Sequence, residues 1–93
     1  MFEDKYDAIE QYLNQHFEDS FIEQANISGD QHFRIPIENG LLMLKVGRNF
    51  IDDNSIEEIL NKLNQWDVVN LLIENKKLGI LVTDSGTSTY QRT

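Results

Sequence analysis

HFRIPIENGLLMLKVGR, residues 32–48, contains two apolar runs on either side of Asn39-Gly40. An Asn-Gly pair between two such runs is the strongest short-range signal of a β-hairpin. In the first run, Phe33, Ile35 and Ile37 alternate with His, Arg and Pro, which predicts a strand with one buried face. We therefore expect this hairpin to be the centre of the fold, covered by the segments before and after it.

The register of the hairpin depends on Pro36, which has no N–H to donate. A two-residue turn at Asn39-Gly40 places apolar side chains on one face, in the pairs Ile37–Leu42, Ile35–Leu44 and Phe33–Val46. It also sets Pro36 opposite Met43 at a hydrogen-bonded position, where the lost bond costs about 1 kcal/mol. A three-residue loop spares that bond but turns three apolar residues of the second strand to the opposite face, at about 1.5–3 kcal/mol each. We therefore predict the two-residue turn.

A helix and a weak strand are predicted before the hairpin. The apolar positions of residues 3–18 recur at helical spacing and form one stripe: Tyr6, Ile9, Leu13 and Phe17. In residues 21–27 the pattern loosens, with Phe21, Ala25 and Ile27 on one side of a possible strand. The hairpin then continues this strand into a three-stranded antiparallel meander.

A second helix is predicted from Ser55 to about residue 65. Ser55 and Glu58 form a capping box, in which each side chain satisfies a free amide of the first helical turn. Residues 68–74 could prolong this helix, but the pair Val68-Val69 and the alternation of apolar residues favour a strand. A turn at residues 75–77 and a last strand over residues 78–82 would complete a second hairpin.

These elements predict the fold class. A helix, a three-stranded antiparallel meander, a helix and a β-hairpin make a single small α+β domain over residues 1–84, with the helices packed on an antiparallel sheet. Residues 85–93, SGTSTYQRT, are predicted to be a polar, flexible tail. The order of elements, the small size and the acidity are similar to those of the small acidic chaperones of type III secretion effectors. The C-terminal helix that these chaperones usually carry is absent from the prediction.

Composition narrows the function classes. The 93 residues include 16 Asp and Glu but only 8 Lys and Arg, for a net charge of -8, which argues against direct nucleic-acid binding and implies a basic partner or solubility. No apolar run is long enough to span a membrane. The chain has no Cys and an acidic N-terminal segment, so no disulfide framework or signal peptide is expected and a cytoplasmic location is predicted. A core this small would benefit from a homodimer.

Several motifs suggest chemistry, but none predicts a catalytic, cofactor-binding or metal site. Residues 81–88 resemble the catalytic turn of aspartic proteases, with Asp84 followed by Ser, Gly and Thr. That chemistry needs two aspartates sharing a proton in a closed site, and a simple turn explains the motif better. Residues 52–58 are rich in oxygen ligands but lack the Gly and Glu spacing of a calcium loop. A dimeric aspartic protease is therefore the third and weakest hypothesis.

The leading hypothesis is a non-catalytic module that binds a protein partner through its sheet or binds itself as a homodimer. The predicted register leaves apolar and basic residues outside the core, and one aromatic residue could act as an anchor. These candidates are Leu41, Met43, Arg34, Lys45, His32 and Trp66. The alternative is an acidic inhibitor that blocks the basic channel of a nucleic-acid-handling protein. It would use an acidic ridge on the first helix, composed of Glu3, Asp7, Glu10 and Glu18.

Overall fold

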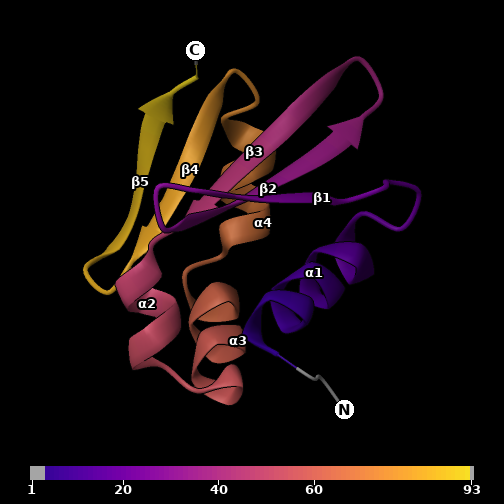
Figure 1. Ribbon diagram of the computed structural model, residues 1–93. Coiled ribbons are helices and arrows are strands. Elements are labelled where there is room, and N and C mark those ends of the chain that lie inside the picture. The colour runs from indigo at the N-terminus through magenta and orange to yellow at the C-terminus, as the bar shows by residue number, and fades with distance from the viewer. Residues whose placement is uncertain (1–3, 93) are drawn as a thin grey trace.

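A five-stranded sheet forms one layer of the protein, and the helices form the other (Figure 1). The computed structural model describes residues 4–92. Its elements are α1 (Lys5–His16), β1 (Glu23–Ile27), β2 (Asp30–Ile37), β3 (Gly40–Val46), α2 (Arg48–Asp53), α3 (Ile56–Gln65), α4 (Val68–Glu74), β4 (Leu78–Thr83) and β5 (Gly86–Gln91). The strands lie side by side in chain order, antiparallel except for the parallel pair β3 and β4. The predicted α+β class is confirmed, although the sheet is mixed rather than purely antiparallel.

The parallel pair explains why residues 68–74 form helix α4 and not the predicted strand. Parallel neighbours need a long crossover that returns the chain to the starting end of the sheet, and α2, α3 and α4 make up this connection. Helix α4 buries Val68 and Leu72, which are four residues apart on one helical face. The alternation of apolar residues in this segment was therefore a misleading signal, because the tertiary connection decided the conformation.

The hairpin of β2 and β3 has the predicted buried face but a different register. Its two-residue turn lies at Glu38-Asn39, so that Ile35 pairs with Leu42 and Phe33 pairs with Leu44. Because side chains alternate with a period of two, this shift of pairing by two residues leaves the same residues on the buried face. The residues with no exposed surface are Phe33, Ile35, Leu42, Leu44 and Val46.

In this register Pro36 interrupts no hydrogen bond of the sheet. The pair next to a two-residue turn, here Ile37 and Gly40, is hydrogen-bonded, and bonding alternates along the strands from there. The backbone of Pro36 therefore points away from β3, toward β1. Strand β1 begins at Glu23, which pairs with Arg34, so no residue of β1 lies opposite Pro36. The Pro36 carbonyl accepts a hydrogen bond from the Ser20 hydroxyl instead. The conflict between the turn and the proline disappears.

At the other edge of the sheet, Gly86–Gln91 forms β5 and pairs with β4 along its whole length. This differs from the prediction of a flexible tail over residues 85–93. The predicted chain reversal is present at Asp84-Ser85, and Gly86 takes a φ of 119°, which suits glycine. Strand β5 contributes no residue to the hydrophobic cluster, so backbone pairing with β4 accounts for its order better than burial does.

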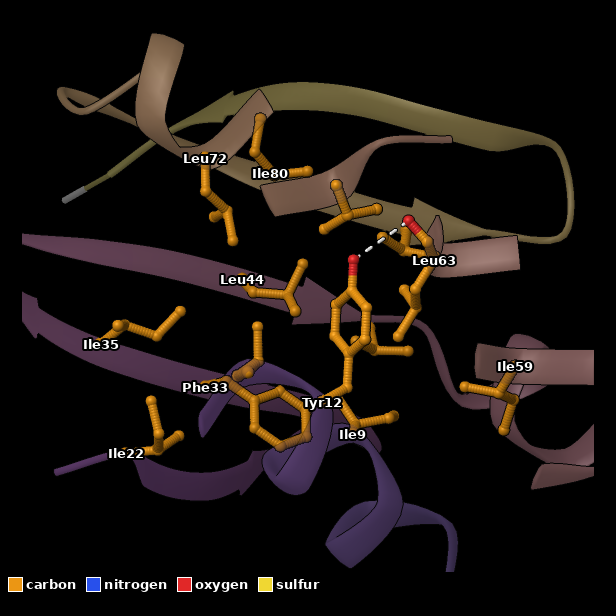
Figure 2. Packing of buried hydrophobic residues seen from close by; sticks show 14 of the residues in the cluster. Ile9, Tyr12, Ile22, Phe33, Ile35, Leu44, Ile59, Leu63, Leu72 and Ile80 are labelled. Carbon is orange, nitrogen blue, oxygen red and sulfur yellow. Dashed lines mark hydrogen bonds between the residues drawn. The ribbon is translucent and has the colours of Figure 1, made fainter. Parts of the chain in front are cut away.

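All four helices pack against one face of the sheet, which we call the inner face (Figure 1). Their buried residues and those of the inner face form a single hydrophobic cluster. Tyr12 lies inside this cluster and donates a hydrogen bond from its hydroxyl to the Leu63 carbonyl at 3.3 Å (Figure 2). The bond joins α1 to the last turn of α3, so the buried hydroxyl is satisfied.

The helix termini follow the sequence signals closely. The predicted capping box is present, since the Ser55 hydroxyl accepts from the Glu58 amide and the Glu58 carboxylate accepts from the Ser55 amide. Helix α1 begins after Asp4, whose carboxylate accepts from the Asp7 amide at 2.7 Å. Along residues 21–27, the side that carries Phe21, Ala25 and Ile27 is exposed, and Ile22, just before β1, supplies the buried contact.

Candidate functional site

The face of the sheet opposite the helices, which we call the outer face, carries none of the helices of residues 4–92. Side-chain alternation along β2 and β3 sends every second residue to this face. Because paired residues share a face, the observed register also places residues of β1, β4 and β5 there. The outer face includes Glu23, Ala25, Ile27, Asp30, His32, Arg34, Pro36, Leu41, Met43, Lys45, Gly79, Leu81, Ser88 and Tyr90.

A hollow of about 360 Å³ lies on the outer face. Residues from β1, β2, β3 and β5 and the residue after β5 line it: Ile27, His32, Arg34, Met43, Lys45, Tyr90, Gln91 and Arg92. The structure thus brings together four residues that the sequence identified as partner-binding candidates. The volume suits one or two side chains of a partner better than a large cofactor.

The sequence did not identify Tyr90 and Arg92, because both fall in the segment predicted as a flexible tail. A signal was present, since Thr87 and Thr89 are β-branched and alternate with Ser88 and Tyr90 after a turn. Pairing of β5 with β4 places Tyr90 opposite Gly79. Arg92 follows the strand and lies in the same wall of the hollow.

The ring of Tyr90 packs directly on Gly79. A Cβ atom at position 79 would lie 2.1 Å from Cζ of the Tyr90 ring, so only glycine leaves room for this arrangement. The ammonium group of Lys45 lies 4.6 Å from the centroid of the same ring, a cation–π contact. Burial raises the pKa of Tyr90, and the positive charge of Arg92 partly opposes the rise. Tyr90 is therefore a neutral hydrogen-bonding group in the floor of the hollow.

Several polar groups of the hollow have no protein partner. The Tyr90 hydroxyl and the Nε and Nη2 atoms of Arg92 are buried, and no described residue forms a hydrogen bond with them. The only ion pair between residues of the described range 4–92 joins Arg48 and Asp52, which lie 3.5 Å apart within α2 and outside the hollow. Buried donors are normally satisfied, and neighbouring atoms cover these three, so an acceptor from outside the chain reaches them only when the side chains turn toward the hollow.

The charges around His32 make the hollow locally positive. Burial lowers the pKa of His32, and the nearby cations Lys45 and Arg34 lower it further, while Asp30 opposes the change. Glu23 is the β1 residue paired with Arg34, but the two side chains form no ion pair. The acidic neighbours therefore do not neutralise the cations of the hollow by direct contact.

The two remaining partner-binding candidates lie outside the hollow. Leu41 is half-buried on the outer face, paired with Pro36 near the turn of the hairpin. Trp66 lies at the end of α3 on the other side of the sheet, where it packs against the core and its ring is 5.9 Å from that of Phe50. Trp66 therefore has a structural environment and does not belong to the outer face.

The acidic ridge is not a continuous row in the structure. Glu3 lies outside the described residues. Asp7 is exposed on α1, but Glu10 is half-buried and accepts a hydrogen bond from the Gln24 side chain at 2.8 Å. Glu18 is exposed beyond the end of α1. One of the four acids is thus turned toward β1, where it anchors the helix to the sheet.

Asp84, in the protease-like motif, forms part of a surface network at the turn between β4 and β5. It accepts a hydrogen bond from Asn54 at 3.0 Å, and Lys62 donates to the Asn54 side chain at 2.8 Å. A hydrogen bond with Asp84 is the main cause that raises the pKa of Asp53, followed by desolvation and repulsion between the two charges. Both carboxylates are exposed, whereas protease chemistry needs a closed cleft around such a pair.

The described residues form no metal cluster and no membrane-spanning helix. Residues 4–92 contain no group of three or more His, Cys, Asp and Glu side chains placed to hold a metal ion. None of the helices in that part of the chain combines the length and the hydropathy needed to cross a membrane. No protein-family model matches the chain, and no curated protein or solved structure is significantly similar to it.

Proposed function

We propose that this protein is a non-catalytic interaction module that binds a protein partner through the outer face of its sheet. The observation that carries the proposal is the asymmetry of the sheet: four helices cover the inner face, while apolar and basic residues surround a hollow on the other. Ile27 is 48% exposed, and both Ile27 and Met43 line the hollow. Apolar residues mixed with Arg and Tyr are typical of binding surfaces.

A different protein fits this face better than a second copy of the chain. A two-fold dimer through the outer face would bring the cations of one hollow toward the same cations of its partner. Each copy also carries a net charge of -8, which adds repulsion at long range. The partner is therefore a protein of complementary chemistry, and we place the interaction in the cytoplasm because the chain has no Cys.

The test uses two isoleucines of similar exposure on different surfaces. Ile27 on the outer face is 48% exposed, and Ile73 on α4 is 42% exposed. The substitution Ile27→Asp introduces a charge into the proposed interface, whereas Ile73→Asp makes the same change outside it. Proteins captured by the immobilised wild type are identified by mass spectrometry, and the affinity of each purified candidate is then measured for all three forms.

We expect Ile27→Asp to weaken the binding of the true partner by at least about tenfold, because a buried isoleucine contributes about 1.5–3 kcal/mol. Ile73→Asp should leave the affinity unchanged. The unfolding midpoints of both variants should stay close to that of the wild type, since neither side chain belongs to the core. A partner that tolerates Ile27→Asp but loses affinity for Ile73→Asp would refute binding through the outer face.

A further inference from the structure

The hollow concentrates positive charge on a strongly acidic protein. It contains three of the eight Lys and Arg residues of the chain, namely Arg34, Lys45 and Arg92, together with His32. None of these cations has a carboxylate partner among residues 4–92, where the one ion pair involves Arg48. The local charge is thus opposite in sign to the net charge of -8. The basic partner implied by composition alone does not fit this part of the surface.

The donors of the hollow come from different strands and converge. Arg34 lies on β2, Lys45 on the paired strand β3, and Tyr90 on β5 across the sheet. The Tyr90 ring cannot sink further because it rests on Gly79, and Lys45 lies over its face. These contacts hold Tyr90 and Lys45 in place before any ligand arrives, which reduces the cost of ordering these two side chains on binding.

The unsatisfied atoms define the kind of group that fits. Two nitrogen atoms of Arg92, Nε and Nη2, and the hydroxyl of Tyr90 are buried and lack an acceptor among residues 4–92. A carboxylate has two acceptor oxygens and matches the fork of a guanidinium group. The apolar side chains of Ile27 and Met43 in the same lining suit the methylene groups that carry such a carboxylate.

We propose that the hollow binds a side-chain carboxylate from an acidic segment of the partner protein, an inference that rests on the proposed function. An Asp or Glu side chain enters the hollow, where Arg34 and Lys45 supply positive charge, and the covered donors of Arg92 and Tyr90 turn toward its oxygens as it binds. A nucleic acid fits less well, because its phosphates would extend beyond the hollow into acidic surroundings. A short acidic segment avoids most of this repulsion, which salt screens over about 8 Å.

The experiment titrates the whole protein with two short probes and follows its amide signals by NMR. The acidic probe is acetyl-Gly-Glu-Glu-Glu-Glu-Gly-amide, and the matched neutral probe replaces each Glu by Gln. We expect the acidic probe to shift the signals of residues that line the hollow and the neutral probe to leave them unchanged. Added salt should weaken this binding. Equal shifts with both probes, or shifts confined to other surfaces, would overturn the proposal.

Charge-matched variants locate the binding site. Arg92→Gln should weaken binding of the acidic probe by about tenfold, because it removes charge-assisted hydrogen bonds. Lys77→Gln makes the same change of net charge in the turn before β4 and should have no effect. If Arg92→Gln disturbs the pattern of amide signals, Arg34→Gln serves in its place. Equal losses for Arg92→Gln and Lys77→Gln would show a general charge effect and refute a specific site.

Inorganic phosphate provides the remaining comparison. If phosphate shifts the same signals and binds as tightly as the acidic probe, the hollow is a general anion site and the proposal for an acidic segment fails. This failure is distinct from failure of the proposed function. If the partner loses affinity for Ile27→Asp but binds Arg92→Gln normally, the outer face is still the interface and only the proposal of a bound carboxylate is refuted. If the partner binds Ile27→Asp normally, the proposal that the outer face is the interface is refuted.

Discussion

The inner and outer faces of the sheet are built from alternate residues of the same strands, yet they follow different rules. On the inner face of β2, Phe33 and Ile35 have no exposed surface and lie in one continuous core. One position away, Arg34 is exposed and His32 is half-exposed. Polar groups in the core, such as the Tyr12 hydroxyl, have partners, whereas Arg92 and Tyr90 on the outer face keep unsatisfied donors. The inner face is packed for stability, and the outer face leaves donors without partners among residues 4–92, which we propose serve binding.

The largest expected difference between the faces is in side-chain truncation. Phe33→Ala removes a side chain with no exposed surface and should lower the free energy of unfolding by about 3–5 kcal/mol. Met43 lies on the outer face of β3, next to Leu44, the residue that pairs with Phe33. Met43→Ala should change the free energy of unfolding by no more than about 1 kcal/mol. Urea denaturation measures both values. If Phe33→Ala does not fold, Ile35→Val should still cost about 0.5–1.5 kcal/mol, and equal costs on the two faces would contradict the comparison.

A smaller effect should appear where the outer face is itself tightly packed. Gly79→Ala places a Cβ atom 2.1 Å from the Tyr90 ring and should displace it, at a cost of about 1–2 kcal/mol. Ring-proton signals of Tyr90 in NMR spectra would report the displacement. In a Tyr90→Ala background the same glycine substitution should cost nothing, because the clash is gone. An unchanged cost in that background would show that the strain has another source.

On the inner face, the test concerns a buried polar group. Tyr12→Phe removes the hydrogen bond to the Leu63 carbonyl but keeps the ring in the core. We expect a loss of about 0.5–1.5 kcal/mol, since the carbonyl is left without this donor. Thermal or urea denaturation is sufficient to measure it. An unchanged free energy of unfolding would mean that the hydrogen bond of the Tyr12 hydroxyl does not contribute to stability. That result would weaken the contrast between the two faces.

The smallest effect should come from His32 on the outer face. Burial, with the charges of Lys45 and Arg34, lowers the pKa of His32 in the folded state, against the opposing charge of Asp30. The unfolded chain therefore binds the proton more readily, and the stability contribution is lost as the pH falls from about 6.5 toward the lower folded value. His32→Gln should remove this part of the pH dependence, measured as unfolding midpoints between pH 5 and pH 7. Identical profiles for both proteins would contradict the role of His32.

Local signals in the sequence predicted the elements whose conformation depends on their own residues. The capping box at Ser55 and Glu58 gave the correct start of α3, and the alternation in β2 identified the buried face. The pairing register was wrong by two residues because the turn signal at Asn39-Gly40 does not say which residues occupy the turn. Four lining residues of the hollow were identified because they lie on one hairpin, while Tyr90 and Arg92 were missed because they lie in the segment predicted as a flexible tail.

The sequence by itself determined the composition of each face, since the alternation of apolar and polar residues along a strand fixes which side chains share a side. Only the tertiary structure decided the parallel pairing of β3 with β4, the helical state of Val68–Glu74 and the order of Gly86–Gln91. These features depend on contacts between segments far apart in the chain, and no local pattern specifies such contacts. The hollow is a product of both, because alternation supplied its residues and the pairing of distant strands brought them together.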